Sequence, residues 1–358
     1  MKVVPKLMWV TVNHKCNFRC RWCYAEHTKF IGQDMPLALA KELIDFAKAL
    51  GLPQVSIIGG EPTLYPHLFE INDYARGIGI NTILVTNGER FSNDVFWEEY
   101  QKHPNDVIGF SVKSGNPQQH KLVTKTLLFE NVKKALTRVT ASKIRTDVSF
   151  VHSTLSVDNF LEIVKMIKSC GVNFILVSFC GPTFEGGKAS SLYMIPFKTL
   201  ATKMMEDYDE ARAIMNGKIQ YATQVPLCIF PFEFIEKMIE DSSFSNTCQI
   251  TESMGVVFTP DGSLAVCNHL TAYPIGKFGV DFKTPEELVE FQNSEKIRRY
   301  YDSFRCYPGE ECKTCSMWNV CAGGCPWNWT VHNPGEVVRP FTKEVKFGRI
   351  FDAVAHDS

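Results

Sequence analysis

The chain is organised around the stretch Cys16-Asn17-Phe18-Arg19-Cys20-Arg21-Trp22-Cys23, which is followed by Tyr24. Its three cysteines have C-x3-C-x2-C spacing and come directly after an apolar run from Leu7 to Val12. Thiolates are the usual ligands of iron–sulfur clusters, and a [4Fe–4S] cluster normally takes four of them. Three cysteines leave one iron open to a small molecule, so the stretch predicts a catalytic cluster. The alternative is a zinc knuckle or a set of buried thiols, but zinc sites favour paired C-x2-C units and four ligands.

Length and composition favour a cytoplasmic protein of about two domains. The chain has 358 residues, 45% of them hydrophobic, with 38 Lys plus Arg against 39 Asp plus Glu. This balance gives no reason to expect a nucleic-acid or membrane partner. No apolar run approaches the ~20 residues that span a bilayer, and we expect no secretory leader. In the cytoplasm, the thirteen cysteines are better explained as metal ligands than as disulfides.

Strand-like and helix-like segments alternate over the first half of the chain. The apolar stretches of the strands are nearly continuous, as in parallel strands that are covered on both faces. The expected strands are Lys6–Val12, Gln54–Ile58, Asn81–Thr86, Val107–Val112, Arg145–Val151 and Val172–Phe179. Amphipathic helices separate them, the first beginning after Pro36 and closed by Gly51. Six βα units predict an α/β fold with a partial (β/α)6 parallel barrel, whose chemistry gathers at the carboxyl ends of the strands.

Polar motifs follow the expected strands at these carboxyl ends. The second strand ends in Gly59-Gly60-Glu61-Pro62, where the glycines permit a close backbone approach to a ligand and Glu61 supplies a carboxylate. The third ends in Thr86-Asn87-Gly88, which is also the pattern of an ordinary turn. The fourth ends in Ser111-Val112-Lys113-Ser114.

Together, the three-cysteine stretch and the Gly-Gly-Glu-Pro motif resemble the radical S-adenosylmethionine (SAM) superfamily. The resemblance implies that Cys16, Cys20 and Cys23 hold a [4Fe–4S] cluster whose open iron chelates SAM. It implies that the motif at Glu61 holds the amino group of SAM. Further SAM contacts are expected from the residues Trp22, Tyr24, Gly59, Gly60, Pro62, Asn87, Ser111, Lys113 and Arg145. Lys113 departs from the Asp that many peptide-modifying members carry, and Arg145 is the weaker candidate of the two cations.

Cys180 ends the sixth expected strand, before Gly181-Pro182. A thiol at that rim can donate a hydrogen atom to a substrate radical, as in some radical SAM epimerases. The alternative is a buried and inert thiol, which is the commoner state of a free cysteine.

The second half of the chain is rich in cysteine. A loop over 181–191 marks the domain boundary, and a helix is expected over 196–216. Eight cysteines follow, the last four with C-x2-C-x5-C-x3-C spacing: Cys228, Cys248, Cys267, Cys306, Cys312, Cys315, Cys321 and Cys325. A hairpin is expected over 255–267, turning at Pro260-Asp261-Gly262. We therefore predict a barrel over 1–185, a helical connector over 186–245, a small cysteine-rich α+β domain over 246–345 and a tail over 346–358.

This half resembles the SPASM extension of radical SAM enzymes, which carries two auxiliary [4Fe–4S] clusters. The resemblance gives Cys248, Cys267 and Cys325 to the first cluster, and Cys312, Cys315 and Cys321 to the second. A downstream cysteine usual in the family is absent, and Pro340-Phe341-Thr342 stands in its place. One allocation adds Cys228 to the first cluster and Cys306 to the second. A structural zinc site with four thiolates is the alternative.

The resemblance implies reductive cleavage of SAM to a 5′-deoxyadenosyl radical. The leading expectation is oxidative modification of a ribosomally made precursor peptide, forming a cross-link or a C–S or C–C bond. The expected partners are that peptide, with delivery by a separate leader-binding protein because strand one starts near residue 6, and an electron donor such as flavodoxin or ferredoxin. The alternatives are formylglycine formation in a sulfatase, oxidation of a small molecule, and a non-enzymatic iron–sulfur electron carrier.

Overall fold

The computed structural model describes residues 5–25, 28–185, 188–222, 224–245, 248, 250 and 255–341. The chain divides into two compact units that interleave along the sequence. The first contains 1–149, 166–172 and 249–304, and the second contains 150–165, 173–248 and 305–358. The predicted tail over 346–358 lies outside the described residues.

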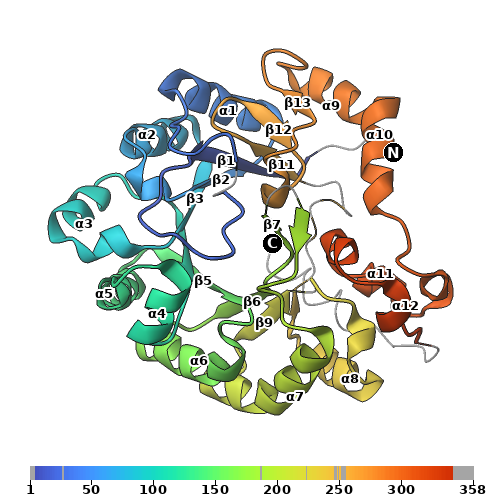
Figure 1. Ribbon diagram of the computed structural model, residues 1–358. Coiled ribbons are helices and arrows are strands. Elements are labelled where there is room, and N and C mark those ends of the chain that lie inside the picture. Colours follow the sequence, from blue (N-terminus) through green and yellow to red (C-terminus); the bar gives the residue numbers. More distant parts are fainter. Residues whose placement is uncertain are drawn as a thin grey trace. The chain divides into compact units, whose positions relative to one another are not determined.

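The first unit is built on a largely parallel sheet with strand order β4-β3-β2-β1-β11-β12-β13 (Figure 1). Its strands are β1 (Leu7–Asn13), β2 (Gln54–Gly59), β3 (Asn81–Thr86), β4 (Val107–Val112), β11 (Gly255–Phe258), β12 (Ser263–Ala265) and β13 (Gly276–Lys277). β1 pairs in parallel with both β2 and β11. The predicted hairpin over 255–267 is present as the antiparallel pair β11–β12. A late segment of the chain thus extends the sheet beside β1.

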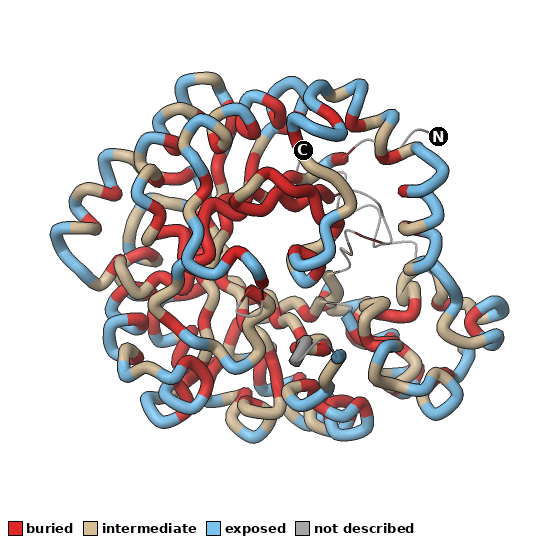
Figure 2. Tube along the Cα trace, turned by 45° about the horizontal axis from the view of Figure 1, so that its top comes forward, coloured by how far each residue is buried: buried red, intermediate tan, exposed pale blue. Residues whose placement is uncertain are grey.

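The two faces of this sheet differ in exposure. The register aligns Trp9, Ser56, Ile83 and Val107 in one row across four strands. These four residues are all half-buried. Figure 2 shows buried stretches of the chain in the interior of the fold. The alternate positions of these strands are buried and form much of the core: Met8, Val10, Val55, Ile57, Leu84, Ile108 and Phe110. Period-two alternation therefore gives the sheet one packed face and one face with access to solvent.

Helices pack on the first unit's strands as the sequence predicts. They are α1 (Leu37–Ala49), α2 (Leu68–Ile78), α3 (Asp94–Tyr100), α4 (Pro117–Thr124), α5 (Phe129–Thr140), α9 (Pro285–Asn293) and α10 (Glu295–Phe304). α1 contacts β1, β2 and α2, and α2 contacts β3. α1 begins directly after Pro36 and is followed by Gly51 with φ +74°, a left-handed conformation that favours glycine.

In the second unit, the strands β6 (Ile175–Phe179), β9 (Ile219–Ala222) and β10 (Phe244–Ser245) are parallel and follow the order β6-β9-β10. A separate hairpin consists of β7 (Thr183–Glu185) and β8 (Lys188–Ser190). The helices of this unit are α7 (Phe197–Ile214), α8 (Phe232–Glu240), α11 (Trp318–Cys321) and α12 (Pro334–Val337). The chain passes between units within β5 (Arg145–His152) and α6 (Phe160–Ser169). No helix within the described ranges is long and apolar enough to cross a membrane.

Candidate active site and cysteine clusters

The three cysteines Cys16, Cys20 and Cys23 lie in the loop that leaves the carboxyl end of β1. All three are half-buried. The Phe18 amide donates to the Cys16 Sγ at 3.3 Å. Burial raises the pKa of the Cys16 thiol to about 12, and the neighbouring thiols Cys20 and Cys23 add to that rise. The Cys16 thiol therefore lies near the other two and stays protonated until a metal replaces its proton.

This cysteine loop is anchored to α4. The Arg19 amide donates to the Thr124 carbonyl at 2.9 Å, and the Arg21 amide donates to the Val123 carbonyl at 3.1 Å. The buried Phe18 ring packs edge-on against the imidazole of His120, with 5.2 Å between centroids. The loop is thus held to α4 by two backbone hydrogen bonds and by the contact between Phe18 and His120.

Gly59 and Gly60 bring the end of β2 against the start of the cysteine loop. A Cβ on Gly59 would lie 2.1 Å from the Asn13 Oδ1, and one on Gly60 would lie 2.5 Å from the Lys15 carbonyl oxygen. The Gly60 amide donates to the Asn13 carbonyl at 2.8 Å. The glycines are therefore required by contact with the protein's own backbone, which is a different reason from the ligand approach that the sequence suggested.

The Glu61 carboxylate is fully buried and accepts four hydrogen bonds from the protein. Its Oε1 accepts from the Thr63 amide at 3.0 Å, the Thr63 hydroxyl at 2.7 Å and the Thr86 hydroxyl at 2.6 Å. Its Oε2 accepts from the Asn87 amide at 2.8 Å. Burial raises the pKa of Glu61, and the four hydrogen bonds counteract part of that rise. Glu61 therefore joins the ends of β2 and β3, and its oxygens are committed to protein donors.

Asn87 connects the end of β3 to the cysteine loop. Its side-chain amide donates to the Asn17 Oδ1 at 2.8 Å, and the Asn17 side-chain amide donates to the Glu89 Oε2 at 2.9 Å. Asn17 lies inside the three-cysteine stretch, but its spacing alone gave no sign of this role. Glu61, Asn87 and Asn17 thus form a chain of hydrogen bonds that fixes the loop.

Ser111 and Lys113 lie at the carboxyl end of β4, on its half-buried face. The Lys113 ammonium donates to the Ser111 hydroxyl. His120, which the sequence analysis did not single out, is buried behind them, with its Nδ1 3.0 Å from the Ser114 hydroxyl. Burial, with a smaller effect of Lys113, lowers the pKa of His120 to about 4. His120 is therefore a neutral packing residue beneath the loop at physiological pH.

Three other predicted SAM contacts have different surroundings. Trp22 and Tyr24 are half-buried in the cysteine loop. The Tyr24 ring stacks on His269, with 5.4 Å between centroids, and its pKa is raised by burial and by the thiols Cys23 and Cys267. Arg145 is at the opposite end of its strand, with 73% of its side chain exposed and Asp147 as its partner at 3.4 Å. The structure gives no support to Arg145 as a SAM contact, because the starts of parallel strands lie at the other edge.

Cys180 directly follows β6 in the second unit. Its amide donates to the His152 carbonyl at 2.8 Å, and its Sγ lies 3.4 Å from the Gly181 carbonyl oxygen. Burial raises the pKa of this thiol to about 12. The thiol therefore retains its hydrogen, and its role as a hydrogen-atom donor stays a prediction.

A second set of cysteines converges in the second unit. Cys228, Cys312, Cys315 and Cys321 line one cavity of about 350 Å³. Burial raises the pKa of Cys321 to about 12 and raises that of Cys228 and Cys312 as well. In the described part of the chain, no group of His, Cys, Asp and Glu side chains is arranged to hold a single metal ion. Four thiolates are the usual ligand set of a [4Fe–4S] cluster, so the residues of this set suit such a cluster.

The grouping differs from the predicted allocation at Cys228 and Cys306. Cys228 shares its cavity with the cysteines of the second set, whereas Cys306 is exposed and is not among the lining residues. Cys267 belongs to the first unit, while Cys248 and Cys325 belong to the second. The first auxiliary set therefore stays a prediction from the sequence.

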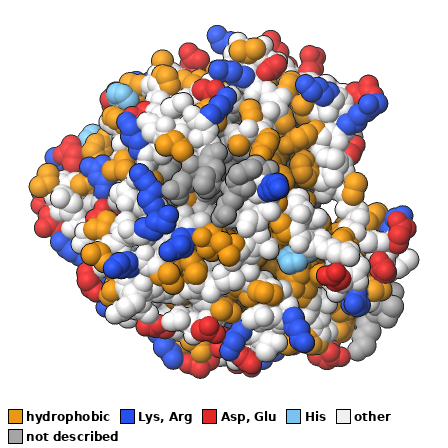
Figure 3. Space-filling model, viewed as in Figure 1, with side chains coloured by type: hydrophobic (Ala, Val, Ile, Leu, Met, Phe, Trp, Pro, Cys, Tyr) orange, Lys and Arg blue, Asp and Glu red, His pale blue; other side chains and the backbone are white. Residues whose placement is uncertain are grey.

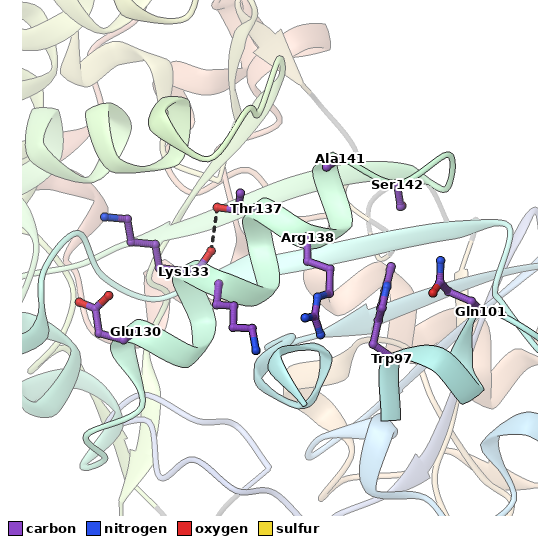
Figure 4. A pocket seen from close by; sticks show the side chains of 9 residues that line it. Trp97, Gln101, Glu130, Lys133, Thr137, Arg138, Ala141 and Ser142 are labelled. Carbon is purple, nitrogen blue, oxygen red and sulfur yellow. Dashed lines mark hydrogen bonds between the residues drawn. The ribbon is translucent and has the colours of Figure 1, made fainter. Parts of the chain in front are cut away.

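A separate groove in the first unit carries no such chemistry. It encloses about 1050 Å³ between α3 and α5, and its lining includes Trp97, Lys133 and Arg138 but no cysteine (Figure 4). Arg138 is paired with Asp94. On the face seen in Figure 3, acidic and basic side chains are interspersed, as the balanced composition predicts. The groups suited to redox chemistry are thus in the two cysteine sites.

Comparison with known proteins identifies the family to which the first half of the chain belongs. Residues 10–183 match the model of the radical SAM superfamily. An S-adenosylmethionine-dependent nucleotide dehydratase from Flammeovirga pacifica is 32% identical over 113 residues, which cover 30% of this chain and 38% of that protein. A probable GTP 3′,8-cyclase from Methanococcus maripaludis is 22% identical over 306 residues, which cover 82% of this chain and 91% of that protein. The chain thus spans only about two fifths of the dehydratase, and substrates do not transfer from it.

Solved structures share the fold over most of the chain. A structure of anSMEcpe with bound AdoMet and Kp18Cys peptide has a TM-score of 0.67 at 20% identity, covering 89% of this chain and 88% of its own. Streptococcus suis SuiB bound to precursor peptide SuiA has a TM-score of 0.61 at 14% identity, covering 90% of this chain and 72% of its own.

The predicted fold is confirmed: a parallel α/β partial barrel is followed by a cysteine-rich C-terminal region that matches SPASM-containing structures. The family match begins within β1 and includes the cysteine loop, the Gly-Gly-Glu-Pro turn and the end of β4. With these motifs folded around one loop, residues 10–183 of the chain belong to the radical SAM superfamily.

Proposed function

We propose that this enzyme oxidises a side chain of a ribosomally made peptide, with an auxiliary iron–sulfur cluster as the electron acceptor. The observation that carries the proposal is the cavity lined by four cysteines in the second unit. A radical enzyme that only returns a hydrogen atom to its substrate has no need of a second redox site. Net oxidation needs one, because a substrate radical must lose an electron to become a stable product.

The first cluster and SAM, when bound, supply the 5′-deoxyadenosyl radical. The residues of the chain position them: Cys16, Cys20 and Cys23 would hold the cluster. The bonds from Asn87 to Asn17 keep the cysteine loop at the carboxyl end of the sheet. Lys113 places a cation on the half-buried face at the end of β4, where it would bind the carboxylate of SAM or a substrate acid. Glu61 acts by holding this framework in place.

The overall oxidation is balanced in hydrogen atoms, electrons and protons. One hydrogen atom of the substrate goes to the 5′-deoxyadenosyl radical, one electron goes to the auxiliary cluster, and one proton goes to solvent or a base. The peptide therefore loses two hydrogens for each bond formed. Peptide as the substrate class is supported by the shared fold with anSMEcpe and SuiB, whose structures contain peptides.

A nucleotide substrate is the second candidate. The relatives with sequence similarity include a nucleotide dehydratase and a GTP 3′,8-cyclase, the latter matching 82% of this chain. A nucleotide would use Lys113 for a phosphate in place of a carboxylate.

The test uses the full chain, reconstituted anaerobically with iron and sulfide, then supplied with SAM and dithionite. Candidate peptides encoded beside the gene and the common nucleoside triphosphates are added separately. We expect one peptide to raise 5′-deoxyadenosine formation above the substrate-free rate and to lose the mass of two hydrogens. A modified nucleotide with unmodified peptides would overturn the proposal and establish the second candidate.

A further inference from the structure

We propose that Cys228 is the fourth thiolate ligand of the cluster held by Cys312, Cys315 and Cys321. This inference rests on the proposed function, because it names the ligands of the auxiliary cluster and the way in which that cluster works. The four thiols line one cavity of about 350 Å³ although Cys228 precedes the others by more than eighty residues in the chain.

The segment that precedes Cys228 is hydrogen-bonded to the cysteine-rich turns near the end of the described chain. The Leu227 amide donates to the Cys321 Sγ at 3.2 Å. The Gln224 carbonyl accepts from the Cys325 amide at 2.9 Å and from the Asn328 side-chain amide at 2.7 Å. These bonds join the chain immediately before Cys228 to the turn from Cys321 to Cys325 and to Asn328.

Gly324 allows this contact. A Cβ on Gly324 would lie 2.7 Å from the Val225 carbonyl carbon, and Gly324 also has a φ of +74°. Because of the close approach and the left-handed conformation, any residue other than glycine would be costly at this position. The turn between Cys321 and Cys325 is thus shaped to receive the segment that brings in Cys228.

The opposite wall of the cavity is formed by Val338, Arg339, Pro340 and Phe341, at the place where related sequences have their downstream cysteine. This segment contributes amides to the thiols instead of a ligand. The Phe341 amide donates to the Cys315 Sγ at 3.4 Å, and the Arg339 amide interacts with the Cys228 thiol. Hydrogen bonds to cluster sulfurs are one of the means by which proteins set reduction potential. Cys228, which lies upstream in the chain, thus supplies the fourth thiolate that residues 338–341 lack.

Full ligation has a functional consequence. A cluster with four protein thiolates has no open iron, so it does not bind substrate directly. The second auxiliary cluster would then serve only to accept and pass on an electron. The cubane would also be enclosed, since Met317 is fully buried and Trp318, Trp329 and Phe341 complete the lining.

The experiment compares Cys228→Ala, Cys228→Ser and Cys306→Ala with wild type in the reconstituted full chain, without any substrate. The readouts are iron and sulfide per chain and the EPR spectrum after reduction. We expect Cys228→Ala to lose about four irons, one cluster's content, and we expect the same loss from Cys321→Ala. Cys228→Ser keeps the shape and offers a weaker oxygen ligand, so we expect its EPR signal to shift. Cys306→Ala should match wild type.

Wild-type iron content and an unshifted EPR spectrum in both Cys228 variants would overturn the assignment. Iron loss in Cys306→Ala with an unchanged Cys228→Ala would do so as well and would assign the fourth ligand of this cluster to Cys306. These readouts need no peptide. Failure to modify any peptide would therefore defeat the proposed function while leaving this result standing.

Discussion

Replacing Glu61 with Gln tests whether the Gly-Gly-Glu-Pro turn holds the protein or the cofactor. Gln has the shape of Glu but only one acceptor oxygen. If that oxygen keeps the three bonds from Thr63 and Thr86, the new NH2 group faces the Asn87 amide, donor against donor. An unpaired buried amide costs about 1–3 kcal/mol.

The three remaining bonds would also weaken, because they change from charge-assisted to neutral. Removal of a buried charge offsets most of that loss, as the raised pKa of Glu61 indicates. We therefore expect Glu61→Gln to lower the free energy of unfolding by about 3 kcal/mol. SAM affinity should fall in parallel, because Asn87 also anchors Asn17 in the cysteine loop.

The assay is chemical denaturation of the apoprotein, paired with equilibrium binding of SAM to the reconstituted enzyme. Glu70→Gln is the matched control on the exposed surface, with an expected change within about 0.5 kcal/mol. A large loss of SAM affinity with unchanged unfolding would refute the reasoning, since it would show that Glu61 contacts SAM directly.

Three further predictions follow from the site. Cys20→Ala should abolish 5′-deoxyadenosine formation while leaving auxiliary iron bound, and wild-type cleavage by the variant would remove this loop from catalysis. Gly60→Ala should lower the free energy of unfolding by about 2–4 kcal/mol, because its Cβ would lie 2.5 Å from the Lys15 carbonyl oxygen. The control is Gly77→Ala in α2, where a Cβ meets no atom, and it should raise the free energy of unfolding by about 0.5–1 kcal/mol. His120 has a lowered pKa of about 4. Its contribution to the free energy of unfolding is therefore present above pH ~6.5 and is lost as the pH falls from there toward 4. Between pH ~8 and ~5, wild-type apoprotein should lose about 2 kcal/mol more unfolding free energy than His120→Gln, and equal losses would show that His120 is charged in the fold.

The strands were predictable where long apolar runs made them so. β3 (Asn81–Thr86) and β4 (Val107–Val112) have the predicted bounds, because a strand buried on one face and half-buried on the other leaves few polar interruptions. β9 and β10, with four and two residues, were missed. Strands this short carry no periodic signal, and they are stabilised by pairing, β9 with β6 and β10 with β9.

The site was predictable as a list of motifs but not as a set of contacts. Spacing identified Cys16, Cys20 and Cys23, and the glycine motif marked the turn after β2. That the glycines face Asn13 and Lys15, and that Glu61 binds Thr86 and Asn87, depends on three strands meeting at one edge. The pairing of Cys228 with the cysteines near the C-terminus likewise depends on how distant turns pack.

The most direct test of the account is iron and sulfide content per chain after anaerobic reconstitution, with 5′-deoxyadenosine measured after SAM and dithionite are added. The account predicts 5′-deoxyadenosine and about twelve irons, about four for each of three clusters. About four irons with zinc in place of the rest would contradict it, because the radical would form but the electron acceptor for a net oxidation would be missing.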